Sequence, residues 1–380
     1  MEQLVRLGDV CTVVSGSTPK TSVDEYWNGD VKWITPAELD ADSYYIHDSV
    51  KHITELGRTK TGLSYMPVGT VILSSRAPIG KTAILGCEMC CNQGFKNLIC
   101  TDRIFNEYLY HFLRAKTNYL NSLGRGATFK ELSKGIVENV LIPLPAIEEQ
   151  HHIADLFASV EELIQTKKQQ LDLFDELVKS RFIELFGDPE TNPKGLEKVL
   201  LSDIAEYFNG LTYSPDNVTN DGTIVLRSSN IQNSQLDFAD TVRVNSSVKD
   251  KLFVKDNDIL MCSRNGSARL VGKVALIKNL SEPMTFGAFM MIIRSRYYPY
   301  LMTYFQMDAF RRQIATGATT TINQITGNML NKISLPLPDM AEINEFAAFV
   351  EQTDKSKLAV QQSIAELEEL KKSLMQKYFG

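Results

Sequence analysis

The sequence lacks the features of several protein classes. No stretch reaches the roughly 18 continuous apolar residues of a membrane-spanning helix. The first ten residues, MEQLVRLGDV, contain no apolar segment of the kind a signal peptide needs. We therefore expect a cytoplasmic protein. Six cysteines in 380 residues are too few for a disulfide framework, so we expect them to remain thiols.

The cysteine spacing also argues against a metal centre. Cys87 and Cys90 form a C-x-x-C pair, and Cys91 and Cys100 lie close by. A structural zinc site usually needs a second ligand pair at suitable spacing, which is missing here. We expect buried or half-buried thiols around apolar segments, and no metal site.

Signatures of catalysis are equally scarce. The sequence has no G-x-x-x-x-G-K-[ST] phosphate loop, no G-x-G-x-x-G, no H-E-x-x-H and no Asp-Pro-Pro-Tyr or Asn-Pro-Pro-Tyr segment. Asp24, Asp30 and Lys32 have the residue types of a metal-dependent nuclease, but the equivalent stretch in the second half, 223–225, has none of them. We therefore predict no catalytic residues and no enzymatic activity.

What the sequence does contain is an internal duplication. LGDVCTVVSG at 7–16 matches LSDIAEYFNG at 201–210, and the Ser-Arg pairs at 75–76 and 263–264 match as well. GRGAT at 124–128 falls on ATGAT at 315–319, LIPLP at 141–145 on SLPLP at 334–338, and the Phe-Gly at 186–187 on that at 379–380. Because these blocks keep their order at a nearly constant offset, the chain is one unit written twice, 1–187 and 188–380.

Each copy combines a mixed globular part with a long helix. Val71–Ser75, Thr82–Leu85 and Asn97–Cys100 have the pattern of strands, and Ile104–Leu120 has helical periodicity. The fold class is therefore predicted as α+β. The predicted segments are 1–146 and 188–339, two similar mixed α/β globular domains, and 147–187 and 340–380, two long helices.

Apolar residues in the helices follow a heptad spacing, which favours a coiled coil. Because the first helix leads from the first globular part to the second, and the second helix leaves the second part, a pair formed by the two helices must run antiparallel. Polar residues interrupt the seam at Lys167, Arg181, Thr353, Lys357 and Lys371. We expect helices of ~33 residues and ~50 Å, with one globular part at each end and a pseudo-two-fold relation between the copies. The predicted seam residues are Ile153, Phe157, Val160, Ile164, Leu171, Phe174, Val178, Leu185, Phe346, Val350, Val360, Ile364, Leu367, Leu374 and Tyr378.

The net charge of −6 would by itself argue against a nucleic-acid partner. The acidity is concentrated in the helical segments: 147–187 and 340–380 together carry −7, and the globular parts together carry +1. The negative charge therefore lies in the helices and not in the globular parts, which would contact a ligand.

Basic residues in the globular parts gather in loops rich in Gly, Ser and Thr. Such loops suit phosphate oxygens, and Arg, Asn and Gln side chains can read base edges. One such loop could be an ordinary hairpin turn, but recurrence in both copies favours DNA. The candidate DNA-binding residues are Thr18, Lys20, Ser75, Arg76, Lys81, Arg125, Thr128, Lys130, Arg264, Asn265, Arg269, Lys273, Thr319, Thr320, Asn323 and Gln324.

With these motifs in this order, the chain resembles the DNA-specificity subunit of type I restriction–modification systems. Each half has a Leu-x-Asp start, a Ser-Arg middle, a Gly-Ala-Thr element, Pro-Leu-Pro and a long helix that ends in Phe-Gly, and Trp33-Ile34-Thr35 looks like the family's early strand. The resemblance implies two domains that each read one half of a bipartite site on double-stranded DNA. It also implies helices that set the gap between the half-sites and dock two adenine methyltransferase subunits.

The same resemblance implies no cofactor in this chain. S-adenosylmethionine would be bound by the methyltransferases, and ATP by restriction subunits with translocase and nuclease activity, where these join. Two other readings of the residues stay open: a two-domain nuclease or transferase with an unrecognised site, and a protein–protein scaffold.

Overall fold

The computed structural model describes residues 3–40, 42–76, 78–126, 130–315 and 324–380. The chain forms two compact units: unit 1 comprises Met1–Lys168 with Gln361–Gly380, and unit 2 comprises Gln169–Val360. Four of the candidate DNA-binding residues, Thr128, Thr319, Thr320 and Asn323, lie outside the described residues. In the described part of the chain, no helix is both long and apolar enough to cross a membrane.

Unit 1 is built on a five-stranded sheet of order β2-β9-β6-β7-β4 and a three-stranded sheet of order β5-β3-β8. A third, two-stranded sheet joins β1 to β10. The strands are β1 (Leu4–Arg6), β2 (Cys11–Ser15), β3 (Trp27–Ile34), β4 (Tyr45–Ile46), β5 (His52–Ile53), β6 (Val71–Ser74), β7 (Thr82–Leu85), β8 (Cys90–Cys91), β9 (Phe95–Cys100) and β10 (Leu141–Pro143). The short helices are α1 (Leu7–Val10), α2 (Glu55–Thr61), α3 (Asn106–Ala115), α4 (Thr117–Leu123) and α5 (Lys134–Glu138).

Unit 2 repeats this plan. Its sheets have the orders β12-β21-β18-β19, β13-β17-β14-β20, β11-β22 and β15-β16. The strands are β11 (Lys198–Leu200), β12 (Glu206–Asn209), β13 (Val218–Thr219), β14 (Thr223–Leu226), β15 (Ile231–Gln232), β16 (Gln235–Leu236), β17 (Arg243–Val244), β18 (Ile259–Cys262), β19 (Val274–Leu276), β20 (Met284–Phe286), β21 (Met290–Arg294) and β22 (Ser334–Pro336). The short helices are α7 (Leu201–Ile204), α8 (Tyr298–Tyr304), α9 (Asp308–Ala315) and α10 (Gly327–Leu330).

The order of the strands confirms the duplication. β2-β9-β6-β7 in unit 1 corresponds to β12-β21-β18-β19 in unit 2, and β5-β3-β8 corresponds to β17-β14-β20. The parallel pairing of β3 with β8 recurs as β14 with β20. Since register and direction both repeat, the two units share a topology as well as sequence motifs.

Two details of the globular parts differ from the sequence prediction. The helix predicted over 104–120 divides into α3 and α4 at Lys116, whose φ and ψ of −93° and 12° leave the helical region, and Thr117 Oγ1 donates to the Arg114 carbonyl at 2.9 Å. The first proline of each Pro-x-Pro segment, which the sequence did not place in a strand, ends the short strand β10 or β22. Leu4 lies opposite Pro143, and Lys198 lies opposite Pro336. Proline is tolerated there because these are edge strands.

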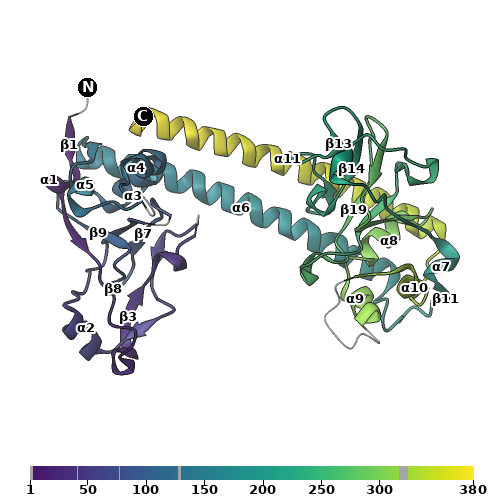
Figure 1. Ribbon diagram of the computed structural model, residues 1–380, viewed down its shortest axis with the longest axis horizontal. Coiled ribbons are helices and arrows are strands. Elements are labelled where there is room, and N and C mark those ends of the chain that lie inside the picture. Colours follow the sequence, from purple (N-terminus) through teal and green to yellow (C-terminus); the bar gives the residue numbers. More distant parts are fainter. Residues whose placement is uncertain (1–2, 41, 77, 127–129, 316–323) are drawn as a thin grey trace. The chain divides into compact units, whose positions relative to one another are not determined.

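The two long helices, α6 (Ile147–Phe186) and α11 (Met340–Phe379), each have 40 residues, more than the ~33 expected. These helices are the long coiled ribbons labelled α6 and α11 in Figure 1. Within unit 1, Phe157 stacks on Phe379 with ring centroids 5.7 Å apart, and Glu161 pairs with Lys371 at 2.5 Å. The residue numbers of the contacting residues fall along α11 as they rise along α6, so the helices run antiparallel in this unit.

Unit 2 contains the remaining halves of both helices, also antiparallel. Asp175 pairs with Lys357 at 2.6 Å, and Arg181 with Glu345 at 2.6 Å. Three of the polar residues that interrupt the predicted seam, Arg181, Lys357 and Lys371, therefore make ion pairs between the helices. Every predicted apolar seam residue is buried or half-buried.

Aromatic side chains from the globular part hold the helix ends in each unit. In unit 1, Tyr108 and Phe112 of α3 contact Phe379 at 5.4 and 5.8 Å. In unit 2, Tyr300 of α8 stacks on Phe182 at 4.9 Å. The heptad pattern did not include Phe182 or Phe379, because both face the domain as well as the partner helix.

Candidate nucleic-acid interface

In unit 1 the Ser-Arg pair lies directly after β6, beside the segment that follows Arg125. Ser75 accepts a hydrogen bond from Leu132 N at 2.8 Å and donates its own N–H to Gly94 O at 2.7 Å. Arg76 and Arg125 both form β-bridges with Glu131. The fold therefore brings together two loops that are about 50 residues apart in the sequence.

Unit 2 places its Ser-Arg pair in the same way after β18. Ser263 accepts from Ile325 N at 2.7 Å and donates to Phe289 O at 2.9 Å. Arg264 bridges to Gln324, and its guanidinium lies 5.7 Å from the centre of the Phe289 ring. Arg264 is exposed and Phe289 is 60% exposed, so a cationic and an aromatic group share this surface.

The loop that contains Thr18 and Lys20 follows β2 and packs on the turn at 92–95 of unit 1, which also contacts Ser75. Gly16 donates to Phe95 O at 3.2 Å, and Thr18 Oγ1 accepts from Asn92 Nδ2 at 2.9 Å. A Cβ at Gly16 would lie 2.0 Å from Asn92 O, and one at Gly210, its equivalent, would lie 2.1 Å from Gly287 O. These two glycines recur because the backbones approach too closely for any side chain.

The recurring lysines of the Gly-Lys motifs are engaged inside the fold. Lys81 Nζ donates to the carbonyls of Pro36 and Leu39, and Lys273 Nζ donates to that of Ile231. Leu39 and Ile231 end two equivalent 3-10 turns, Pro36–Glu38 and Ser228–Asn230. Each ammonium thus satisfies carbonyl groups that the end of the turn leaves free.

Ser75 is likewise committed to the fold. It is fully buried; its hydroxyl donates to Gly94 O at 3.0 Å and lies 3.3 Å from Lys96 Nζ. Lys96 is 5% exposed and pairs with Glu131 at 3.6 Å. Burial lowers the pKa of Lys96, and the Glu131 carboxylate partly opposes this effect. The Lys96–Glu131 pair links β9 to the segment after Arg125.

The other candidate residues divide by exposure. Thr18, Arg76 and Asn265 are half-buried, and Asn265 Nδ2 donates to Ser228 Oγ at 3.3 Å. The residues with exposed side chains are Lys20, Arg125, Lys130, Arg264, Arg269 and Gln324.

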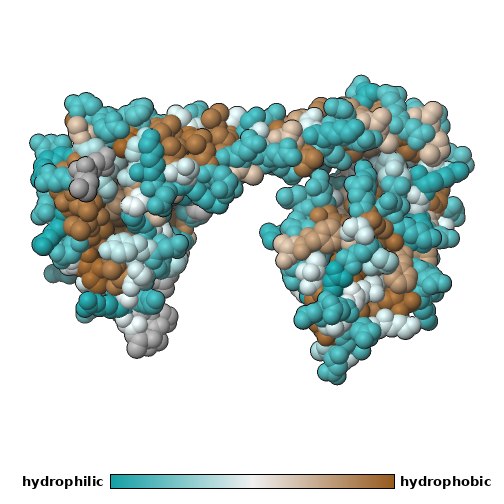
Figure 2. Space-filling model, turned by 90° about the horizontal axis from the view of Figure 1, so that it is seen from above, coloured by the Kyte–Doolittle hydropathy of each residue, from teal (hydrophilic) through white to brown (hydrophobic). Residues whose placement is uncertain are grey.

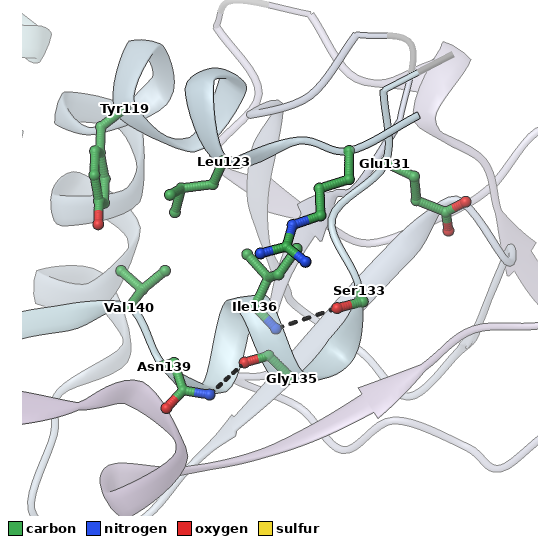
Figure 3. A pocket seen from close by; sticks show the side chains of 9 residues that line it. Tyr119, Leu123, Glu131, Ser133, Gly135, Ile136, Asn139 and Val140 are labelled. Atoms are coloured by element: carbon green, nitrogen blue, oxygen red, sulfur yellow. Dashed lines mark hydrogen bonds between the residues drawn. The ribbon is translucent and has the colours of Figure 1, made fainter. Parts of the chain in front are cut away.

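A cleft of about 790 Å³ opens beside Arg125 in unit 1 (Figure 3). Its floor is formed by α5, where Ser133 Oγ accepts from Ile136 N at 3.3 Å and Asn139 Nδ2 donates to Gly135 O at 2.7 Å. The lining residues are Tyr119, Leu123, Arg125, Glu131, Ser133, Gly135, Ile136, Asn139 and Val140. The cleft is therefore open, mixed in polarity and continuous with the Arg125 loop.

Phe289, Asn92 and Lys96 contact candidate residues of these loops but were not among the residues predicted from the sequence. Phe289 follows Gly287 and Ala288. It lies beside Arg264, which is 25 residues earlier in the sequence, because β18 pairs with β21. An exposed aromatic after a glycine was the only available signal. Among the described residues, no three His, Cys, Asp or Glu side chains come together as metal ligands, and the six cysteines are free thiols.

Comparison with known proteins places both units in one group. The family model "Type I restriction modification DNA specificity domain" matches residues 2–173 and 193–369. The MjaIX specificity subunit of Methanocaldococcus jannaschii is 38% identical over 54% of this chain, and the match spans only 52% of that protein. The MjaVIII specificity subunit of the same organism is 22% identical over 98% of this chain and 91% of its own.

Two solved structures share the fold. The type I restriction–modification S subunit from M. genitalium has a TM-score of 0.55 at 12% identity, and covers 100% of this chain and 96% of its own. A chain from a structure titled for complex assembly and conformational transition of the type I R-M system has a TM-score of 0.60 at 20% identity, with 99% and 97% coverage.

Proposed function

Because the chain belongs to the family of type I restriction–modification DNA specificity domains, we propose that it is a non-catalytic subunit that reads a bipartite site on double-stranded DNA, one half-site per unit. One observation carries this proposal: both units present an arginine at the surface beside the same pair of loops, Arg125 in unit 1 and Arg264 in unit 2. Lys20, Lys130 and Arg269 add exposed positive charge for phosphate contacts.

The set of residues proposed to contact DNA is smaller than the set of candidates predicted from the sequence. Lys81, Lys273 and Ser75 have their polar groups engaged within the fold. The contacts to DNA are therefore assigned to the exposed arginines, Lys20, Lys130 and Gln324, with Thr18, Arg76 and Asn265 at their margins. In unit 2 Phe289 supports the Arg264 side chain by a cation–π contact.

The helices are proposed to dock two adenine methyltransferase subunits, and restriction subunits where these exist. Exposed leucines lie among charged residues on both helices: Leu163 and Leu370 in unit 1, and Leu173, Leu177 and Leu358 in unit 2. On the face that Figure 2 displays, apolar patches (brown) lie between hydrophilic side chains (teal). S-adenosylmethionine and ATP would be bound by those partners, and the complex would act in the cytoplasm.

Arginine variants of the assembled complex test the DNA contacts. Once methylation mapping of the host genome has given the target, we expect Arg264→Ala and Arg125→Ala each to weaken binding. The loss is about 1–3 kcal/mol where the arginine reads a base, or a salt slope smaller by about one where it contacts a phosphate. Lys198→Ala, an exposed lysine of β11 outside these loops, is the matched control. Unchanged affinity and unchanged salt slope in both arginine variants would remove these loops from the interface.

Helix length is proposed to set the gap between the half-sites. Forty helical residues extend about 60 Å, so one heptad adds about 10 Å, or roughly three base pairs. We expect that heptads inserted after Lys168 and after Val360 lengthen the unread gap and leave both half-sites unchanged. A heptad in only one helix breaks the register and serves as the control. An unchanged gap in the double insertion would refute the role of helix length.

A further inference from the structure

Two cysteines of unit 1 lie directly opposite each other on neighbouring strands. Cys11 of β2 is the register partner of Cys100 of β9. Thr101 N donates to Val10 O at 3.0 Å, so the hydrogen bond flanks the cysteine pair rather than joining it. Cys11 and Cys100 are therefore a non-hydrogen-bonded pair, in which Cα atoms approach to about 4.5 Å and side chains lie on the same face.

This separation falls within the range of about 4.4–6.8 Å that a disulfide requires. Both sulfurs are free thiols. Cys11 is 4% exposed, whereas Cys100 is half-buried, so a small reagent reaches the pair from the Cys100 side. A hydrogen bond with Cys100 and burial raise the pKa of the Cys11 thiol. Before any reaction, the two thiols are thus in contact, lie on the same face of the sheet and can be reached by a small reagent from one side.

We propose that Cys11 and Cys100 are an oxidisable thiol pair, which a low-molecular-weight disulfide converts to a cross-strand disulfide. The Cys100 thiolate attacks the reagent, breaks its S–S bond and releases one small thiol. Cys11 then attacks the Cys100 sulfur of the mixed disulfide and releases the second small thiol. The two thiol protons pass to the two released thiolates, so two cysteines are oxidised and one reagent disulfide is reduced.

Unit 2 provides a natural comparison for this pair. Glu206 of β12 lies opposite Arg294 of β21, and the next positions along these two strands are Ala205 and Ser295. The second copy of the fold therefore has no thiols at this place. Oxidation would tie β2 to β9, at the end of this strand pair opposite the Gly16 turn, in unit 1 alone.

The test uses the full chain in redox buffers of oxidised and reduced glutathione, followed by alkylation and tryptic digestion without reduction. The sequence separates the relevant cysteines: peptide 7–20 carries Cys11, peptide 97–103 carries Cys100, and the other four lie in peptides 82–96 and 256–264. We expect a linked 7–20/97–103 species, an intact mass lower by about 2 Da, and reversal by dithiothreitol.

Variants taken from the second copy provide the controls. Cys11→Ala and Cys100→Ser introduce the residues that unit 2 has at these positions, so both are compatible with the fold, and each should abolish the linked species. Cys262→Ala, in a buried strand of unit 2, should retain it. Linkage through any other cysteine, a mixed disulfide at Cys100 that never resolves, or six alkylatable thiols in every buffer would each overturn the proposal.

Discussion

Replacing His111 by phenylalanine tests how the contact between α3 and α6 responds to acid. His111 is fully buried, its ring stacks on Phe157 with centroids 4.9 Å apart, and neither ring nitrogen has a hydrogen-bond partner among the described residues. Burial, aided by the positive charges of Lys371 and Arg114, lowers its pKa from 6.5 to about 3. Folded unit 1 therefore keeps this imidazole neutral, whereas the unfolded chain protonates it.

The sign and size of the effect follow from this difference. Because the folded pKa is depressed, the stability that His111 allows is complete above pH 6.5 and is lost as the pH falls toward 3. Each pH unit costs about 1.4 kcal/mol, so the change from pH 6.5 to 5 lowers the free energy of unfolding by about 2 kcal/mol. His111→Phe removes this cost, keeps the stacking on Phe157, and eliminates two unpaired buried nitrogens.

The chain provides a reporter for unit 1 alone, since its two tryptophans, Trp27 and Trp33, both lie there. Urea unfolding followed by tryptophan fluorescence between pH 5 and 8 should show a difference between variant and wild type that grows by about 2 kcal/mol toward pH 5. His152→Phe, at an exposed position on α6, is the control and should give curves parallel to wild type. If His111→Phe is also parallel to wild type at every pH, then His111 is not held neutral by the fold.

Two further predictions concern residues that recur in both copies. Lys81→Met and Lys273→Met should each destabilise their own unit by about 1–3 kcal/mol, because the carbonyls at the end of a 3-10 turn lose a charged donor. Thermal unfolding measures this, with Lys198→Met as the exposed control. If both variants are as stable as the control, these lysines have no structural role and return to the list of phosphate ligands. Gly210→Ala should prevent correct folding of unit 2, since its Cβ would lie 2.1 Å from a backbone oxygen, whereas Gly266→Ala meets nothing within 4 Å. Equal yields of folded protein for these two variants would contradict the close approach.

The duplication could be recognised from the sequence because motif order survives even where single motifs are short. It predicted two units of the same kind. The local residue pattern predicted the strands β6, β7 and β9, and the heptad spacing with the order of the segments predicted the antiparallel helices. The sequence could not predict that α3 ends at Lys116 or that Pro143 and Pro336 lie in edge strands, since both depend on neighbours distant in the sequence.

At the candidate site, the recurrence of a motif does not predict whether its side chains are free to bind a ligand. The recurrence of Ser75, Lys81 and Lys273 in matching motifs predicts that they share a ligand. The structure places these side chains in hydrogen bonds that stabilise the fold common to both units. Residues that occur in both copies first of all stabilise the backbone fold that the two copies share. Residues that differ between the copies, such as Phe289 beside Arg264, are better candidates for reading different half-sites.

Unit 1 consists of two separate segments of the sequence, and this determines when its fold can be completed during synthesis. Its core includes Phe379, which contacts Tyr108, Phe112 and Phe157, yet this residue lies in a segment that follows the whole of unit 2 in the sequence. Unit 2, from Gln169 to Val360, is made of one uninterrupted segment. The ribosome therefore finishes the second unit before it releases the last helical turns that the first unit needs. The part of the protein that is translated first is therefore completed after unit 2, and its apolar helix-binding surface stays uncovered until the segment that follows Val360 has been made.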